Sequence, residues 1–245
     1  MEELEKLTLA KIVSLKPEAA SLFEKHHLDF CCKGKQTLAE ALINDEQKKI
    51  EVTKALKDIF NEKDAKLGIK FDDLALSKLI DYIIEIHHRY VKEAGAVILN
   101  HLDKVVSKHS ERHPELIKIK DLFSEVNREL ELHMIKEELI LFPRIKEMEL
   151  LVKSNVRESQ LVFIEAPIHV LEDEHEMAAN HLNQINGITN NYAVPADACT
   201  TYRLAFDELR MFEHDLHKHV HLENNLLFPK ALILQNKLEK IVSAN

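Results

Sequence analysis

Two stretches of sequence, HMIKEELILFP at residues 133–143 and HVHLENNLLFP at residues 219–229, carry most of the information about the expected fold and site. Both contain a histidine, a glutamate four residues later, a leucine and a Phe-Pro pair, at identical spacing. Residues i and i+4 of an α-helix lie on one face, so each His-x-x-x-Glu presents both side chains to one metal region. One copy is a weak signal, but two copies in a repeated plan predict a metal centre.

The composition around these stretches favours long helices. The chain of 245 residues contains 4 glycines, 6 prolines and no tryptophan, far fewer turn residues than a β-protein of this length needs. Apolar residues recur in steps of three and four, which predicts long helices over residues 74–107, 114–151, 167–187 and 195–240. The expected fold is all-α, with these helices packed as an antiparallel four-helix bundle.

The predicted organisation has two domains. Residues 1–60 form short helices around an adjacent pair of cysteines, residues 61–72 form a polar linker, and residues 73–245 form the bundle. Residues 152–165 connect the second and third long helices. A fragment that begins near residue 68 is therefore expected to fold and to bind metal alone.

The apolar stripe of each long helix is interrupted by a polar residue that can bind metal. There is one histidine per helix, and the second and fourth helices add a glutamate one turn later. The six residues are His88, His133, Glu137, His175, His219 and Glu223. In the first helix the stripe is expected to run through Ile80, Ile84, His88 and Val91. Burying an unpaired carboxylate costs several kcal/mol, and two of them repel. A pair of divalent cations satisfies all six side chains and removes this repulsion.

The mixture of ligand types indicates which metal to expect. Imidazole with carboxylate suits iron, manganese or zinc, and the placement of the cysteines excludes a four-cysteine zinc site. Two carboxylates among six ligands suit bridging between two ions, which favours a redox-capable centre, with iron ahead of manganese. A rival interpretation uses Glu85-x-x-His88 and Glu172-x-x-His175, the pairs expected of ferritin-like bundles. Glu85 and Glu172 are then outer partners or occasional ligands, or equally well solvated residues.

The nine other histidines of the predicted bundle are expected to lie at the surface or to support the ligands. His221 is expected to point across its helix, away from the metal of His219. His109 ends the first long helix, where an imidazolium interacts well with the helix terminus. Cys199 is interpreted as a structural residue just inside the fourth long helix. An odd number of cysteines, two of them adjacent, argues against a disulfide framework.

Charge and hydropathy exclude several classes of function. The formal net charge is −9, and an acidic body binds nucleic acid and anionic membranes poorly. No apolar run approaches the ~18 residues that a membrane span needs. The N-terminus has acids where a secretory signal has basic residues. We expect a soluble cytoplasmic protein with no nucleic-acid or membrane partner.

Several motifs resemble those of the iron–sulfur cluster repair di-iron proteins, the ScdA/YtfE-like family. They are the two repeated stretches, LDFCCKGKQTLAEA at 28–41, the EDEHE segment around His175, and PADACTTY at 195–202. The resemblance covers nearly the whole chain. It implies an N-terminal Cys-Cys domain, a hemerythrin-like bundle and two non-haem iron ions per chain. It also implies the same six ligands, with Glu137 and Glu223 bridging. His87 beside His88 is a local departure from the family pattern.

The resemblance also implies a function and partners. The family restores iron–sulfur clusters damaged by nitric oxide or oxidants, and its members are cytoplasmic and often homodimeric. Damaged iron–sulfur proteins are the implied partners, and nitric oxide or dioxygen the implied small ligands. We expect repair by iron donation or by removal of nitric oxide. Two other classes stay open: a hemerythrin-like protein that binds or senses dioxygen or nitric oxide, and a ferritin-like iron oxidase or store.

Cys31 and Cys32 have two interpretations. They are small buried residues at a helix junction, or a thiol pair whose thiolate form is favoured by a helix start and by Lys33 and Lys35. The residues alone support both interpretations equally. The resemblance favours a functional pair that exchanges iron or nitric oxide with the bundle or with a client.

Overall fold

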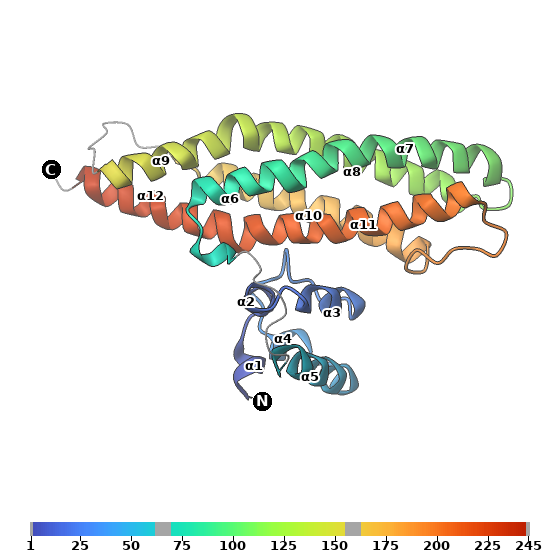
Figure 1. Ribbon diagram of the computed structural model, residues 1–245, viewed down its shortest axis with the longest axis horizontal. Coiled ribbons are helices and arrows are strands. Elements are labelled where there is room, and N and C mark those ends of the chain that lie inside the picture. The colour runs from blue at the N-terminus through green and yellow to red at the C-terminus, as the bar shows by residue number, and fades with distance from the viewer. Residues whose placement is uncertain (1, 62–69, 155–162, 244–245) are drawn as a thin grey trace.

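The computed structural model describes residues 2–61, 70–154 and 163–243 (Figure 1). Within these ranges every element of regular secondary structure is a helix, which confirms the all-α prediction. Most of the predicted linker 61–72 and most of the connection 152–165 lie outside the described residues, and the exact domain boundaries stay a prediction. No helix in the described ranges is both long and apolar enough to cross a membrane.

Four long helices form the antiparallel bundle, and three of them contain a π-helical turn. They are α6 (Leu76–Tyr82) with η2 (Ile83–His88) and α7 (Arg89–His109), then α8 (Glu115–Lys136) with η3 (Glu137–Leu141) and α9 (Phe142–Ser154), then α10 (Glu165–Ile188), and last α11 (Thr200–Leu222) with η4 (Glu223–Leu227) and α12 (Phe228–Ser243). Helix α7 packs against α8 and α11, and α10 packs against the same two helices. The fourth helix begins at Thr200, later than the predicted 195.

The π turns correct one detail of the predicted stripes. A π turn inserts one residue into the helical repeat. In the first helix this shift buries Ile83 completely and leaves the predicted Ile84 only half-buried. Every other position of the predicted stripes on the four helices is buried. The stripes therefore identify the core, although the insertions themselves leave no mark in the apolar periodicity.

The N-terminal domain consists of short helices joined by capped turns. The helices are α1 (Glu2–Lys6), α2 (Leu9–Leu15), α3 (Ala19–Lys25), α4 (Leu38–Ala41) and α5 (Glu46–Asn61). Thr8 caps α2 by accepting a hydrogen bond from the backbone of Lys11, and Thr37 forms a capping box with Glu40. Such caps satisfy backbone N–H groups that a short helix otherwise leaves unpaired. The loop between α3 and α4 carries the two adjacent cysteines.

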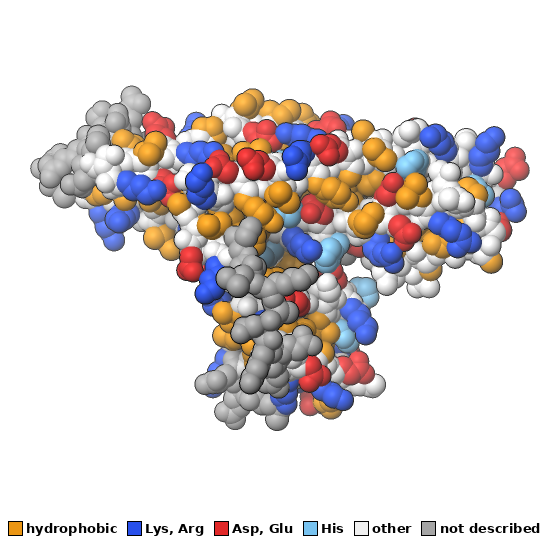
Figure 2. All heavy atoms as spheres, viewed as in Figure 1, with side chains coloured by type: hydrophobic (Ala, Val, Ile, Leu, Met, Phe, Trp, Pro, Cys, Tyr) orange, Lys and Arg blue, Asp and Glu red, His pale blue; other side chains and the backbone are white. Residues whose placement is uncertain are grey.

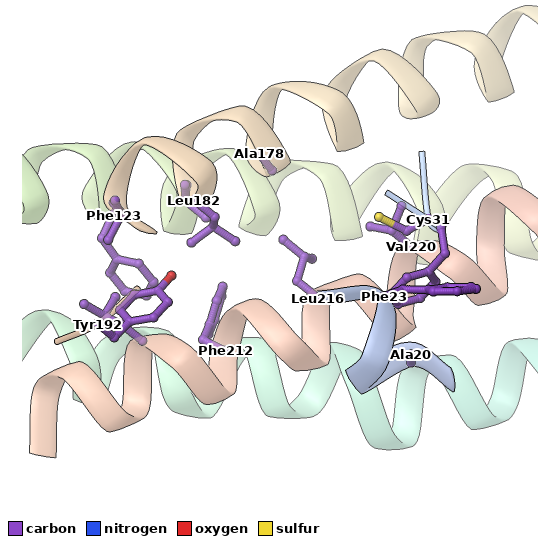
Figure 3. Close-up of a cluster of buried hydrophobic side chains, with 14 of the residues drawn as sticks. Ala20, Phe23, Cys31, Phe123, Ala178, Leu182, Tyr192, Phe212, Leu216 and Val220 are labelled. Carbon is purple, nitrogen blue, oxygen red and sulfur yellow. The ribbon is translucent and has the colours of Figure 1, made fainter. Parts of the chain in front are cut away.

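This loop docks on the side of the bundle, near its middle (Figure 1). The Phe30 ring lies edge-on to His217 and His221, with ring centroids 6.1 and 5.7 Å apart. Asn225 of η4 donates a hydrogen bond to the carbonyl of Cys31 at 2.8 Å. Phe23, Cys31 and Val220 belong to one continuous hydrophobic cluster that joins the two domains (Figure 3). Apolar packing and backbone hydrogen bonds together fix the loop on the bundle.

Ionic contacts surround the docked loop. Glu24 of α3 contacts His214 and lies 3.0 Å from His217 Nδ1. Burial would raise the pKa of Glu24, but these two histidines outweigh it and lower the pKa. Figure 2 shows histidine side chains gathered where the N-terminal domain meets the bundle. The carboxylate of Glu24 therefore stays ionised beside them.

Replacing Gly34 by alanine is expected to loosen this docking. A Cβ atom at Gly34 would lie 2.4 Å from the backbone oxygen of Phe30 and 2.5 Å from Asn225 Oδ1. Since backbone cannot give way cheaply, we expect a loss of about 1–3 kcal/mol, measured by urea unfolding and by proteolysis of the N-terminal domain. Gly187→Ala is the control, because its Cβ meets nothing within 4 Å and helix propensity favours alanine. Equal stability of the two variants would contradict the close approach.

Candidate metal centre

The structure brings together all six side chains that the sequence predicts as ligands. His88 ends the π turn η2, and Glu137 and Glu223 begin η3 and η4. His133, His175 and His219 come from α8, α10 and α11. None of the six is more than 1% exposed. Three of the four helices thus change from α to π geometry where they supply a ligand-type side chain, as π turns often do at functional sites.

The six side chains form two overlapping groups. His88 and His219 combine with Glu137 and Glu223 in one group, while His133 and His175 combine with the same two glutamates in the other. Within each group one potential ligand atom of every residue lies within 4.8 Å of the others. Each glutamate therefore faces both groups, which is the position of a carboxylate shared between two cations.

Several buried polar atoms of the two groups have no hydrogen-bond partner, and this indicates that the groups fit metal ions. Both oxygens of Glu137, one oxygen of Glu223 and His88 Nε2 are buried without a hydrogen-bond partner. The Nε2 atoms of His133 and His175 face each other at 2.9 Å, as two nitrogen ligands of one ion do. Leaving buried polar atoms unsatisfied costs about 1–3 kcal/mol each. Cations between the helices would satisfy all of these atoms together.

The pKa shifts of these side chains also indicate a cation-binding site. Burial would lower the pKa values of His88 and His133, but the neighbouring carboxylates, Glu137 foremost, outweigh burial and raise both to about 10. Burial and Glu223 would raise the pKa of Glu137, yet the neighbouring histidines lower it. The site thus stabilises positive charge next to its two carboxylates. Metal ions that bind imidazole and carboxylate take the place of such protons.

Outer residues hold the histidine rings in place. The Nδ1 atoms of His88 and His175 lie 2.8 Å from Glu138 Oε1 and Asn224 Oδ1, respectively. Glu138 and Asn224 occupy equivalent positions of the sequence repeat, each directly after a shared glutamate. Bonds at Nδ1 fix the tautomer that turns the Nε2 lone pair toward a metal.

The repeated Phe-Pro pair has a related role. Phe142 stacks on His88 and Phe228 stacks on His175, with ring centroids 5.7 and 6.2 Å apart. Both phenylalanines are about 1% exposed. They cover two of the ligand-type rings and keep water from that side of the site.

Comparison with known proteins agrees with this geometry. Residues 79–231 match the family model described as the hemerythrin HHE cation binding domain, and residues 5–61 match ScdA_N, a domain of unknown function. The iron–sulfur cluster repair protein YtfE of Enterobacter sp. (strain 638) is 33% identical over 224 residues, which cover 91% of this chain and 96% of that protein. YtfE of Escherichia coli O81 (strain ED1a) is 35% identical over 221 residues, 88% of this chain and 92% of the relative.

A third relative has a similar name. The probable iron–sulfur cluster repair protein of Haemophilus influenzae is 32% identical over 216 residues, with 88% of this chain and 92% of the relative covered. The chain belongs to the iron–sulfur cluster repair protein family. Its bundle is a hemerythrin-type cation-binding domain, and the two histidine–glutamate groups lie inside the matched segment.

The two glutamates of the ferritin-like interpretation lie away from the groups. Glu85 is exposed on η2. Glu172 accepts a hydrogen bond from His169 at 3.2 Å and lines a surface cavity. The carboxylate that contacts a ligand-type histidine from α10 is instead Glu174, at 2.9 Å from His133 Nδ1. Glu174 directly precedes His175 but lies off the apolar stripe, so the stripes do not predict its role.

The two halves of this family member differ at one outer position. Glu174 precedes His175, and the repeat places His87 at the equivalent position before His88. His87 is buried, stacks on the His219 ring at 5.6 Å and contacts Asp215 at 3.1 Å. Among the described residues His219 Nδ1 has no hydrogen-bond partner. At this position one half of the repeat has a carboxylate that contacts His133, and the other half has an imidazole ring that stacks on His219.

Glu174→Gln is expected to weaken iron binding at His133 and His175. His133 and Lys136 keep this carboxylate ionised and lower the pKa of Glu174 to about 2. An outer carboxylate makes a ligand histidine a stronger base, and losing one typically lowers metal affinity about 10–100-fold. Competition with a chelator should show one iron per chain leaving earlier than in the wild type. Glu172→Gln on the same helix is the control, and indistinguishable release curves would contradict the role of Glu174.

The cysteine pair lies apart from the two groups, in the docked loop. Asp29 Oδ1 accepts hydrogen bonds from the backbone N–H groups of Cys31 and Cys32 and from the Cys31 thiol. The hydrogen bond with Cys32, burial and Asp29 all raise the pKa of Cys31 well above its ordinary value. The expectation of enhanced thiolate character is thus wrong for Cys31. Cys32 is half-buried and, with Lys35, Glu172 and Asn224 among its neighbours, lines a cavity of about 180 Å³.

Three of the remaining histidines are buried. His87, His109 and His221 are 8% exposed or less, so none of them is a surface residue. Burial lowers the pKa of His221 to about 4. As expected, His221 belongs to neither histidine–glutamate group, and its ring faces Phe30 of the N-terminal domain. The docked domain therefore explains why this polar ring is buried.

Proposed function

We propose that the bundle holds two non-haem iron ions and that the protein uses them to restore damaged iron–sulfur clusters. The observation that carries the proposal is the pair of histidine–glutamate groups that share Glu137 and Glu223. Imidazole and carboxylate ligands suit iron and also manganese. The names of the relatives, which are iron–sulfur cluster repair proteins, favour iron.

Each residue has a distinct task in this proposal. His88 with His219 and His133 with His175 each hold one ion, and Glu137 and Glu223 bridge the two. Glu138, Glu174 and Asn224 orient three of the histidine rings. When bound, the iron pair supplies electron exchange and open positions for small ligands such as nitric oxide or dioxygen.

The docked cysteine loop supports repair rather than simple binding of a gas. The cavity beside Cys32 is also lined by Asn224, which holds the His175 ring. One side chain thus separates a thiol-lined cavity from a metal ligand. Asp29, Cys31 and Cys32 form a further group whose potential ligand atoms lie within 4.8 Å of one another. These contacts support a thiol pair that exchanges cargo iron or nitric oxide between the bundle and a damaged client protein.

The two alternative functions have less support. A ferritin-like oxidase or store needs Glu85 and Glu172 at the metal, and neither belongs to the two groups. A hemerythrin-like carrier or sensor of dioxygen or nitric oxide does not need the docked thiols. A cytoplasmic location and a homodimer, both implied by the resemblance, stay predictions.

Reactivation of a damaged client tests the proposed function. An iron–sulfur enzyme inactivated with nitric oxide is incubated anaerobically with the iron-loaded protein, and the recovery of its activity is followed. Loading the protein with ⁵⁷Fe and recording Mössbauer spectra of the separated client distinguishes iron donation from removal of nitric oxide. Recovery no faster than in the absence of the protein would overturn the function.

Replacing Cys31 and Cys32 by serine is expected to slow this reactivation while leaving the iron content unchanged. A cysteine sulfur binds iron with release of its proton and accepts nitric oxide, whereas a hydroxyl does neither. Iron per chain and the rate of client recovery are measured on the same preparation. Cys199→Ser is the matched control, because this cysteine lies far along the chain in another loop and lines no part of the cavity. Equal recovery by the double variant and the wild type would show that the pair is structural.

A further inference from the structure

A cysteine–histidine contact lies at one end of the bundle, where α7 ends and α11 begins (Figure 1). Cys199 is the residue directly before α11, and its thiol makes no capping hydrogen bond to that helix. Instead its Sγ atom lies 3.3 Å from His109 Nε2. Cys199 is exposed, contrary to the structural role just inside the helix that the sequence suggested.

The imidazole of His109 is buried, and among the described residues its hydrogen-bond partner is the Cys199 thiol. His109 is the last residue of α7, is 8% exposed, and its Nδ1 atom has no hydrogen-bond partner among the described residues. Tyr202 packs edge-on against the ring at 5.4 Å and holds it in place. The neighbouring His113 is already engaged, because its nitrogens contact Glu115 and Asp197 at 3.1 and 3.0 Å. Among the described residues no carboxylate contacts the His109 ring, and its Nε2 atom faces the Cys199 sulfur.

The two helix ends are suited to charge separation between these side chains. The carbonyl groups at the C-terminus of α7 carry partial negative charge, and the amide groups at the N-terminus of α11 carry partial positive charge. An imidazolium on His109 and a thiolate on Cys199 match these charges. Asp197 lies two residues before Cys199, but Arg112 and His113 pair with its carboxylate.

We propose that Cys199 and His109 form a reactive thiol–imidazole pair that takes up small-molecule disulfides. His109 Nε2 accepts the thiol proton, and the Cys199 thiolate attacks one sulfur of the disulfide. The disulfide S–S bond breaks as a new bond to Cys199 forms, and the released thiolate takes the proton back from His109. The small disulfide is the two-electron oxidant, so the products are one protein mixed disulfide and one free thiol.

The other two thiols are less suited to this reaction. Cys31 is buried and donates its proton to Asp29, and the pKa of its thiol is raised. Cys32 is half-buried in the docked loop. We therefore expect Cys199 to react first in the native protein, and the reaction does not depend on the proposed iron chemistry.

Kinetics of disulfide exchange test the pair. The full-length, iron-loaded protein with Cys31→Ser and Cys32→Ser carries Cys199 as its sole thiol. It is mixed with an aromatic disulfide that releases a coloured thiol, and separately with oxidised glutathione, followed by intact mass. We expect one modification per chain at a rate at least about tenfold above that of free glutathione at the same pH, and a loss of about tenfold or more with His109→Gln.

The neighbouring histidine provides the control. His113→Gln removes an imidazole that contacts Asp197 rather than the thiol, so its rate should match that of the parent protein. If the parent protein, with Cys199 as its sole thiol, reacts no faster than free glutathione, the proposal is overturned. This outcome does not depend on whether His109→Gln folds, which circular dichroism checks. An unchanged rate in a folded His109→Gln protein overturns the role of the imidazole.

Discussion

Replacing Glu137 or Glu223 by alanine is expected to remove the two-ion site from an otherwise folded bundle. Each carboxylate belongs to both groups, so either change would take a ligand from both of the proposed ions at once. It also removes negative charge from between two divalent cations, whose repulsion rises steeply at short distance in a buried site. Iron per chain should fall from about two, as expected for a di-iron bundle, to less than one, measured by elemental analysis and Mössbauer spectroscopy.

The ferritin-like glutamates provide controls for this experiment. Glu85→Gln and Glu172→Gln change side chains that lie outside both groups, and both variants should keep the wild-type iron content and spectra. Full iron with unchanged spectra in both alanine variants would show that neither glutamate bridges the ions. Loss of iron from the two glutamine variants would instead favour the ferritin-like site.

Removing iron should lower the melting temperature of the bundle substantially. A ligand present at 1,000 times its dissociation constant stabilises the folded state by about 4 kcal/mol. For a chain of this size that energy corresponds to a change in Tm on the order of 10 °C. Without cations, two buried carboxylates and four histidines must satisfy one another across the middle of the core. Circular dichroism melts of the iron-loaded and chelator-treated protein measure the difference.

Two comparisons separate this effect from damage caused by chelation. Adding ferrous iron back under anaerobic conditions should restore the original melting curve. The Glu137→Ala protein should melt at the same temperature with and without iron, because it lacks a shared ligand. Identical melting of the loaded and treated wild type would mean that the six side chains do not hold the metal in the folded state.

The ligand-type residues were predictable because they break a rule of the apolar stripes. His133 and Glu137 fall on a line that should otherwise be apolar, so their burial needs a counter-charge. Glu138 and Glu174 could not be found in this way, since neither lies on a stripe. Glu138 reaches His88 from a different helix, and only the packing of the helices shows that contact. The repeat alone would have related Glu138 to Asn224.

The π turns and the docking surface could not be predicted from the sequence for another reason. A π turn changes the periodicity by one residue over a single turn, which the two isoleucines at 83 and 84 conceal because both are apolar. His221 is polar and lies off the apolar stripe of its helix, yet it is buried because Phe30 of the N-terminal domain covers it. Periodicity describes one helix at a time, whereas a docked domain buries a face that the helix leaves polar.

Three consecutive residues of η4 serve three different partners. Glu223 faces both metal groups, Asn224 holds the His175 ring, and Asn225 donates to the carbonyl of Cys31. An insertion or deletion of one residue here would reassign all three side chains at once. The helical register of η4 therefore sets the placement of the thiol loop relative to the metal centre.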